Sequence, residues 1–579
     1  MIWGCLRCAV QWRHERPAPL DFAMTLPPTD TSTLIPAADR APDAITPETG
    51  PLTEIEHAAV NTGIARAAGI VSLGNVLSSI LGLVREIVKS HLFGASGAVS
   101  AYNVAAILPS QLYDLLVGGL VNSALVPMFS EVAARKGKAE LWRLLSLLLS
   151  LAVVFLSIAI LAIEVLAPLV ARLMAGGFDE PLLQTTTDLL RITIPAVLFL
   201  SLSGVLSGLL YALKRFAFPA FASPLYNASM IVVAVLLAAQ FGIAAMALGL
   251  LVGSILQVAF QIPALRGAHI RWHFDLRDPV LRQLVRLYIP VAGGVIIGQI
   301  AILISLNLAS RTGASGIAWM DYPTRLIQFP LGLIVSAVSI AILPSLSRHA
   351  ADDSPIEFRS TLGQGLRLVL VLIIPSAIGM AVLAPHIVQL LFQHGAFTPV
   401  DTQAVTIMLW LYLIGLIFAG VNQPLVFAFY ARKDTLTPAI VGLICNVGLY
   451  LMAALLPAAL SGRALQVYDL AIANSVQWTS HAFIMLWLLR HRLGGLRGFG
   501  LSRLLIKAAV GSVAMGAGAW LVISLLTHLL GETSTVREAI SVIGAAVVGF
   551  AIYIGAMAAM KVSEINSIGQ IIKRRIARV

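Results

Sequence analysis

The chain has 579 residues, of which 58% are hydrophobic and only 12% are charged, and its mean hydropathy is +0.89. Soluble globular proteins carry about 25% charged residues, so this composition excludes an ordinary soluble protein. Apolar runs recur along the chain, and each is long enough to cross a hydrocarbon layer of about 30 Å. The composition therefore predicts a polytopic membrane protein.

Residues 1–60 differ from the rest of the chain. They are rich in Pro, Thr and Asp and have no apolar period, so we expect a disordered cytoplasmic extension. No signal-peptide block follows the first arginines, and Met24 is an alternative start. Cys5 and Cys8 form a single C-x-x-C, whereas a tetrahedral zinc site needs four ligands, and Cys445 stands alone in an apolar run. The sequence therefore predicts no metal site and no cofactor.

Charged or Pro/Gly-rich breaks divide the remaining chain into apolar segments. Backbone polar groups in lipid must be satisfied within one element, so we interpret each segment as a helix. The predicted helices cover residues 66–90, 100–129, 142–174, 183–213, 217–240, 243–265, 281–309, 316–346, 360–384, 402–430, 436–460, 467–489, 503–529 and 537–560. The predicted fold class is an all-α polytopic membrane protein with fourteen transmembrane helices.

Lysines and arginines are concentrated in every second loop, for example in "ARKGKAELWR" and "RHRLGGLRGFGLSR". The opposite loops hold mainly single positive residues, and Lys89 is counted among these. Because cytoplasmic loops are enriched in Lys and Arg, we expect the rich side and both termini to be cytoplasmic. Topology also explains the net charge of +11 better than nucleic-acid binding does, because the charge lies in short loops at membrane ends.

One phrase occurs twice in the chain, as "YALKRFAFPAFASPLYN" from Tyr211 and as "YARKDTLTPAIVGLICN" from Tyr430. The Tyr, Ala, Lys, Pro and Asn recur at an offset of 219 residues, and six predicted helices separate the copies. An even number of helices preserves orientation, so the repeats are parallel. We expect an N-terminal six-helix lobe over 61–275, a pseudo-symmetric C-terminal six-helix lobe over 276–492, and a two-helix tail over 493–579. The phrase itself is interpreted mainly as a structural corner.

Two such lobes around a cleft suit alternating access, so polar residues within helices are the candidate site. The first helix carries Ser78, Ser79, Arg85 and Glu86, and the helical spacing puts Ser78 and Arg85 on one face. Two interpretations of Arg85 stay open here besides a cavity role. In the first, the Arg85 side chain extends toward the outer surface together with Lys89. In the second, it forms a local ion pair with Glu86.

The eighth predicted helix carries Asp321 and Arg325 four residues apart, followed by Gln328. Two prolines in this stretch weaken the helix and favour a polar niche. The second helix adds a further set of polar residues, namely Asn103, Gln111, Asp114 and Asn122. One arginine from each lobe at a shared cavity forms a plausible clamp for a diphosphate, because guanidinium donates in a planar fork.

The stretches "LGLVREIVKSHLFGAS", "ILPSLSRHAA", "LFQHGAFTPVDT" and "AFYARKDTLTP" resemble the MurJ/MviN lipid II flippases of the multidrug/oligosaccharidyl-lipid/polysaccharide exporter superfamily. The likeness runs from about residue 66 to 560. It implies fourteen helices in two lobes, with the last pair forming a groove for the lipid tail. It also implies movement of an undecaprenyl-diphosphate-linked peptidoglycan precursor from the inner to the outer leaflet of the bacterial cytoplasmic membrane.

Carried over by position, the resemblance makes Arg85 and Arg325 cavity arginines and Ser78 a cavity serine. Other family charges are absent, since Ser79 and Asp114 stand where the family has arginines and Gln328 where it has an acid. The complete set of candidate substrate-binding residues is Arg85, Arg325, Ser78, Ser79, Gln328, Asn103, Asp114 and Glu86. The expected partners are a lipid-linked glycan diphosphate and membrane lipid, with no nucleic acid; the oligomeric state stays open.

Three alternatives to a lipid II flippase are left open. The first is a flippase for another polyprenyl-linked oligosaccharide or an antiporter for small molecules in the same fold. The second is a polytopic glycosyltransferase, which needs a metal-binding acidic pair in an external loop. The only candidate that we find for such a pair is "FDE" at 178–180, and it is weak. We therefore do not expect this chain to be an enzyme. The third is a scaffold that no longer transports, which the lost cavity charges permit.

Overall fold

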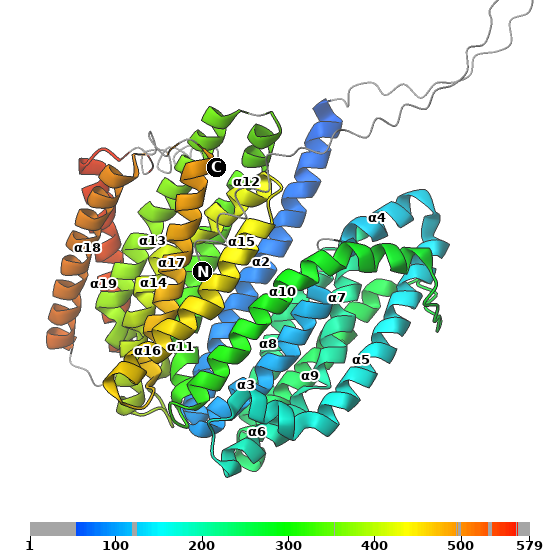
Figure 1. The fold of residues 1–579 in the computed structure, drawn as a ribbon, viewed down its shortest axis with the longest axis horizontal. Coiled ribbons are helices and arrows are strands. Elements are labelled where there is room, and N and C mark those ends of the chain that lie inside the picture. Colours follow the sequence, from blue (N-terminus) through cyan, green and yellow to red (C-terminus); the bar gives the residue numbers. More distant parts are fainter. Residues whose placement is uncertain are drawn as a thin grey trace, which may run out of the picture. The chain divides into compact units, whose positions relative to one another are not determined.

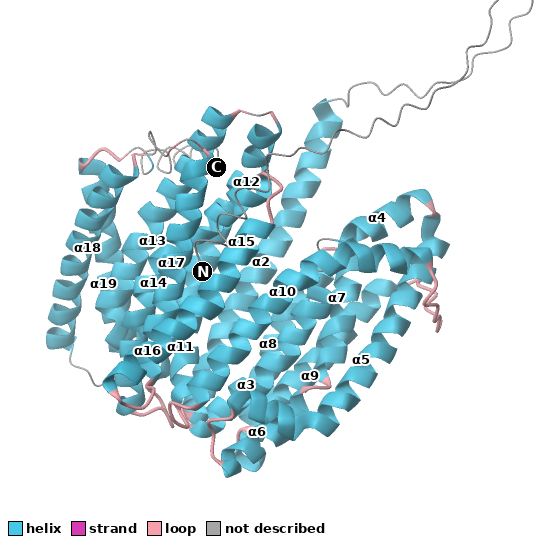
Figure 2. Ribbon diagram, in the orientation of Figure 1, coloured by secondary structure: helices cyan, strands magenta, loops and turns pink. Residues whose placement is uncertain are grey.

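The computed structural model describes residues 54–118, 124–352, 354–493, 495, 500–530, 535–562 and 564, and the predicted extension before residue 54 lies outside them. The chain divides into two compact units, Met1–Asn61 and Thr62–Val579, and the second contains nearly all of the helical residues. The described residues are helical throughout, with short connecting loops and no strand (Figure 2). The all-α prediction is therefore confirmed.

The helices are named in chain order (Figure 1). The first group consists of α2 (Glu54–Phe93), α3 (Gly97–Tyr113), α4 (Val126–Arg135), α5 (Gly137–Ala175), α6 (Glu180–Thr193), α7 (Ala196–Ala212), α8 (Ala217–Phe241) and α9 (Ala244–Gln261). The second group consists of α10 (Pro279–Ser310), α11 (Gly316–Pro330), α12 (Ser336–Ala351), α13 (Pro355–Phe392), α14 (Pro399–Ala431), α15 (Leu436–Leu443), α16 (Tyr450–Ser461) and α17 (Val467–Arg492). Finally, α18 (Leu501–Leu530) and α19 (Thr535–Ala559) lie side by side against α13.

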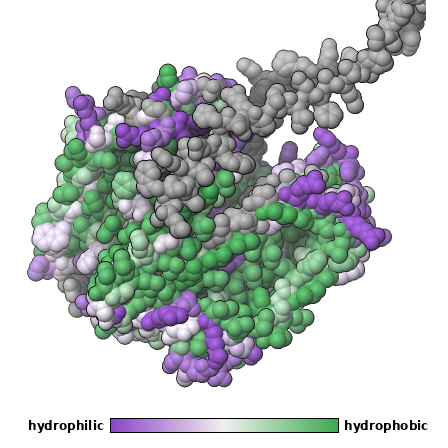
Figure 3. Space-filling view, viewed as in Figure 1, coloured by the Kyte–Doolittle hydropathy of each residue, from purple (hydrophilic) through white to green (hydrophobic). Residues whose placement is uncertain are grey.

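Eleven helices among the described residues are long and apolar enough to cross a membrane. The predicted spans at 100–129, 281–309 and 467–489 do not meet that criterion. α3 has 17 residues and α17 contains Asp469 and His481, whereas the apolar stretch of α10 whose side chains are described is limited to Gly298–Ser310. The count of fourteen spans therefore stays a prediction. A broad apolar surface lies between polar ends on the face shown in Figure 3, as expected for a protein embedded in lipid.

The repeated phrase builds the same corner twice. Lys214 and Lys433 both adopt a left-handed backbone, with φ of 57° and 59°. In each copy, the backbone N–H of the residue after the lysine donates a hydrogen bond to a carbonyl in the last turn of the preceding helix. The Arg215 N–H donates to the Leu210 carbonyl at 2.8 Å, and the Asp434 N–H donates to the Phe429 carbonyl at 3.0 Å. This is the six-to-one bond of a helix-ending Schellman motif. The interpretation as a structural corner is confirmed for the lysine of each copy.

A second internal repeat involves the ends of α3 and α11. Each runs into a π-helical segment, η1 (Asp114–Gly118) after α3 and η4 (Leu331–Val335) after α11. These segments begin 217 residues apart, which is also the separation of Pro127 in α4 and Pro344 in α12. A third π-helical segment, η5 (Ile444–Leu449), interrupts the helix formed by α15 and α16. Because π-segments disturb the regular hydrogen-bond ladder, they occur frequently at functional sites.

The segment between the two groups packs along α5. Two serines one turn apart on α5, Ser146 and Ser150, accept hydrogen bonds of 3.1 Å from the backbone N–H groups of Arg271 and His273. The spacing matches, because four helical residues and two extended residues both span about 6 Å. Asp278 then caps α10 by accepting from the Val280 N–H at 2.8 Å. The connection is thus attached to the first group before the second begins.

Candidate functional site

A cavity of about 720 Å³ lies between the two groups. Residues from α2, α3, α8 and α9 line one side, and residues from α10, α11, α14 and α17 line the other. Six of the eight candidate residues line it, namely Arg85, Glu86, Asn103, Asp114, Arg325 and Gln328. The structure thus brings together side chains that are more than two hundred residues apart in sequence.

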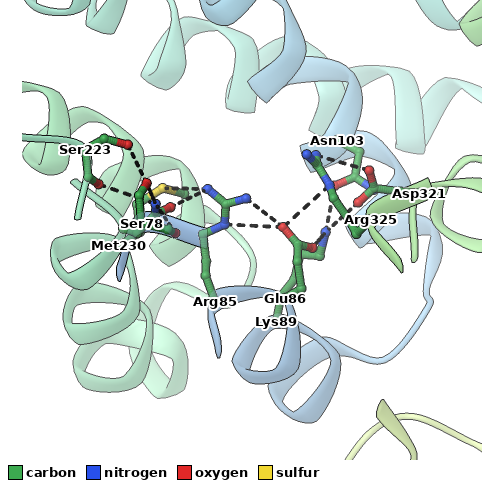
Figure 4. A network of polar contacts seen from close by, with 10 residues as sticks. Ser78, Arg85, Glu86, Lys89, Asn103, Ser223, Met230, Asp321 and Arg325 are labelled. Atoms are coloured by element: carbon green, nitrogen blue, oxygen red, sulfur yellow. Dashed lines mark hydrogen bonds and ion pairs between the residues drawn. The ribbon is translucent and has the colours of Figure 1, made fainter. Parts of the chain in front are cut away.

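Glu86 is the centre of the charged network in this cavity (Figure 4). Its Oε1 lies 2.8 Å from Nη2 of Arg85, and its Oε2 lies 2.5 Å from Nζ of Lys89. Arg325 approaches from the second group, with its Nε 3.9 Å from Oε1 of Glu86. Only 3% of Glu86 is exposed, and a carboxylate so buried is tolerated only when cations compensate it. The local pairing of Arg85 with Glu86 is therefore confirmed, and it occurs within the cavity.

Lys89 joins the two groups. Its Nζ lies 2.9 Å from Oδ2 of Asp321 and donates to Oδ1 of Asn103 at 3.2 Å. The same ammonium lies 5.1 Å from the ring centre of Tyr322. The expectation that Lys89 is a loop residue of the external side is wrong, because it is 2% exposed and lines the cavity. The signal was present in "REIVK", whose helical spacing puts Lys89 beside both Arg85 and Glu86.

Arg325 is held by its own helix. Its Nη2 lies 3.2 Å from Oδ1 of Asp321 one turn earlier, as the four-residue spacing suggested. Its Nε makes no hydrogen bond within the described part of the chain, and neither does Nδ2 of Asn103. Both atoms belong to residues that line the cavity. These two buried donors are available to an acceptor in the cavity, and a phosphate oxygen is a suitable one.

Asn227 positions Arg85 and was missed as a site residue. Its Oδ1 accepts from Nη1 of Arg85 at 2.9 Å, and its Nδ2 donates to the hydroxyl of Ser78 at 3.3 Å. Asn227 ends the first copy of the repeated phrase, which was the available signal. In the second copy, Asn446 accepts from Nε2 of Gln477 at 2.8 Å, which is a contact between helices.

Ser78 and Ser79 do not line the cavity in this structure. The Ser78 hydroxyl shares a hydrogen bond of 2.6 Å with Ser223 of α8, so it belongs to the contact between α2 and α8. The Ser79 hydroxyl donates to the Asn75 carbonyl of its own helix at 2.9 Å. Their roles in substrate binding stay predictions.

One end of the cavity is closed by contacts between the groups. The Ala396 N–H donates to the His91 carbonyl at 2.9 Å, and the Tyr322 hydroxyl donates to the Gly94 carbonyl at 2.7 Å. Nearby, the Gly177 N–H donates to the Ser310 hydroxyl at 2.9 Å. At the opposite end, Arg143 of α5 pairs with Asp278 at the start of α10, whereas the described residues of α11, α12 and α14–α17 make no hydrogen bond or ion pair there with those of α2–α9. The two ends of the cavity therefore differ, as they do in one state of an alternating-access transporter.

Comparison with known families decides the assignment. Residues 89–540 match the family described as "Lipid II flippase MurJ". The chain belongs to the MurJ lipid II flippase family. The resemblance seen in the sequence motifs is confirmed.

Individual relatives agree with this MurJ assignment. The chain is 31% identical over 471 residues to a probable lipid II flippase MurJ of Haemophilus influenzae, covering 77% of this chain and 90% of that one. It is 32% identical over 386 residues to lipid II flippase MurJ of Burkholderia cenocepacia, covering 64% of this chain and 74% of that one. MurJ relatives and many apolar helices together indicate a multi-pass protein of the bacterial inner membrane.

Solved structures share the fold. A structure described as lipid II flippase MurJ in an inward closed conformation aligns with a TM-score of 0.69 and 23% identity, covering 85% of this chain and 98% of that one. An inward-facing multidrug-resistance MATE family transporter aligns with a TM-score of 0.62 and 13% identity, covering 72% of this chain and 95% of that one. At these identities the likeness concerns the fold alone.

Proposed function

We propose that this MurJ family member moves lipid II, an undecaprenyl-diphosphate-linked peptidoglycan precursor, from the inner to the outer leaflet by alternating access. The observation that carries the proposal is the cation cluster in the cavity, in which Arg85 and Lys89 of the first group and Arg325 of the second surround Glu86. A site made by both groups changes when they move against each other. A ligand there can therefore be coupled to the opening of either end.

The two arginines are the proposed diphosphate ligands. Each guanidinium is held by a neighbour on the same helix, Arg85 by Glu86 at 2.8 Å and Arg325 by Asp321 at 3.2 Å. Such pairing orients the planar fork before the ligand arrives, which lowers the entropy cost of binding. Glu86 is a positioning residue in this scheme, because it keeps two like charges close together when no phosphate is present.

The cation-rich loops support a cytoplasmic location for both termini, as the sequence predicts. With that orientation, the closed end of the cavity around His91 and Gly94 faces outward, and the structure corresponds to a state that receives substrate from the cytoplasmic leaflet. Fourteen spans in two pseudo-symmetric lobes with a C-terminal pair are part of the same proposal. Support for the pseudo-symmetry comes from the two left-handed lysine corners and from the paired π-segments.

The test is replacement of the resident lipid II flippase in a bacterium from which that protein can be depleted. We expect cells that express this chain to stay viable, and we expect the purified chain to move fluorescent lipid II across vesicle membranes. An inserted protein that neither rescues the cells nor moves lipid II would overturn the proposal. If the chain moves another polyprenyl-linked oligosaccharide in that assay instead, it is a flippase with a different substrate. If it moves neither lipid, the alternative of a scaffold that no longer transports is favoured.

A further inference from the structure

The carboxylates of the cavity are not equivalent. Glu86 and Asp321 are both paired with cations, whereas Asp114 has no ion pair or hydrogen-bonded side chain within the described part of the chain. Asp114 follows α3 at the start of η1 and lines the cavity. Gly118 leaves room for it, since a Cβ there would lie 2.9 Å from Oδ1 of Asp114. Among the described residues, Asp114 is thus an exposed, unpaired carboxylate of a cavity whose other two lining carboxylates, Glu86 and Asp321, are paired with cations.

Asp114 also lies far from the cation cluster. Asn103, which contacts Lys89, is eleven positions earlier on the same helix, and this spacing corresponds to about 16 Å. Gln111, one turn before Asp114, lines the cavity between them. The cavity therefore has a cationic end around Glu86 and an anionic end at Asp114.

This separation of charge restricts the ligand. A headgroup that carried only negative charge would gain at the arginines and be repelled at Asp114. A headgroup with a diphosphate at one end and an ammonium at the other would be attracted at both, and complementary charge of this kind confers specificity. The peptide of a peptidoglycan precursor carries such a primary amine when its diamino acid is unmodified.

We infer that Asp114 binds a primary ammonium group on the headgroup of the transported lipid, so that the transporter distinguishes amine-bearing from amine-blocked precursors. The inference rests on the proposed function and adds a determinant of specificity to it. Gln111 and Gln328 line the same cavity and provide neutral hydrogen-bonding groups there. The diphosphate remains bound at Arg85 and Arg325.

The experiment uses vesicles that contain the full chain and either lipid II with a free side-chain amine or the same lipid with that amine acetylated. We expect the acetylated lipid to be moved at least about tenfold more slowly, and Asp114→Asn to move both lipids at one similar, reduced rate. Asp352→Asn is the matched control, because Asp352 is an exposed carboxylate that does not line the cavity. The double variant Gln111→Glu with Asp114→Asn returns a carboxylate one turn away, and it should recover part of the discrimination.

The outcomes separate this inference from the proposed function. If the unaltered chain moves both lipids equally fast, the role of Asp114 is overturned while lipid II transport stands. The same conclusion follows if Asp114→Asn still discriminates between the two lipids. If the unaltered chain moves neither lipid, the proposed function itself fails and this inference fails with it.

Discussion

Lys89 of α2 and Asp321 of α11 form an ion pair of 2.9 Å that joins the two helix groups beside the closed end of the cavity. The lysine is 2% exposed and lies next to Glu86 as well, so one ammonium neutralises carboxylates from both groups. A buried ion pair contributes little net stability, but the loss of one partner leaves an uncompensated charge. The pair therefore makes the closed arrangement depend on both residues being present.

We expect Asp321→Asn to weaken closure of that end and to increase the population that is open on the outer side. Breaking a buried pair costs about 3–5 kcal/mol, which exceeds the preference of many transporters for one state. Spin labels on the outer ends of α6 and α11 would report longer distances in the variant. Asp188→Asn, which alters an exposed pair with Arg191, is the control and should leave the distances unchanged.

Arg325→Ala should abolish rescue of flippase-depleted cells while the protein still inserts. Among the described residues, the cationic end of the cavity has three cations for two paired carboxylates, and the loss of one cation removes this excess of positive charge. Growth is measured together with the amount of protein in the membrane fraction. Arg348→Ala, at the end of α12 and away from the cavity, should rescue normally. Full rescue by Arg325→Ala would remove this arginine from the diphosphate site.

Arg85→Lys should lower lipid II transport by at least about tenfold, although it preserves the charge. An ammonium cannot hold Asn227 and Glu86 and also bind phosphate through a planar fork, as the guanidinium is proposed to do. The initial rate in vesicles is the measurement. Arg172→Lys, whose partner Glu180 lies in an exposed pair, serves as the matched exchange and should transport at the normal rate. A normal rate for Arg85→Lys would mean that only its charge is required.

Gly177→Ala should disturb the closed end directly. A Cβ at this position would lie 2.4 Å from the backbone nitrogen of Arg311, so the backbones of the two groups could not stay in contact. We expect greater accessibility of a single cysteine placed at Ser310 to a membrane-impermeant reagent added outside. Gly555→Ala has open space around the new methyl group and should leave that accessibility unchanged. Equal labelling in the two variants would show that the closed end tolerates separation at this point.

The corner of the second repeat should be sensitive to acid. Burial raises the pKa of the Asp434 carboxyl, but hydrogen bonds from Arg492 and from Thr437 outweigh that effect, so the pKa lies below its ordinary value. A carboxyl with a lowered folded-state pKa contributes stability above its unfolded pKa, near 4, and that stability is lost as the pH falls through the folded value. We expect Asp434→Asn to lower the melting temperature at pH 6, and we expect this difference to shrink as the pH falls below about 4. An Asp434→Asn melting temperature equal to that of the unaltered chain at pH 6 would contradict the assignment.

Much of this molecule could be read from its sequence. Long apolar runs predicted the helices, since a helix is the economical way to satisfy backbone groups in lipid. The repeated phrase predicted two matching corners, and Lys214 and Lys433 form them. Arg85, Glu86 and Arg325 were selected because ionisable residues within apolar helices are costly and therefore usually functional.

The sequence did not identify Lys89, because a lysine near the end of a span is equally compatible with a solvated loop. It also could not separate Ser78, which packs against α8, from residues that line the cavity. Helical spacing defines which residues share a face, but it does not say whether that face meets lipid, a neighbouring helix or a cavity.

The sequence by itself determined the helices, their turns and the family, because hydrophobic length, turn-forming residues and local motifs act over short distances along the chain. Only the tertiary structure decided that Lys89 bridges to Asp321, that Asn227 holds Arg85, and that Asp114 is left without a partner among the described residues. The physical reason is that a charge within a membrane protein is stabilised by the groups that packing brings beside it, and these come from helices distant in the chain.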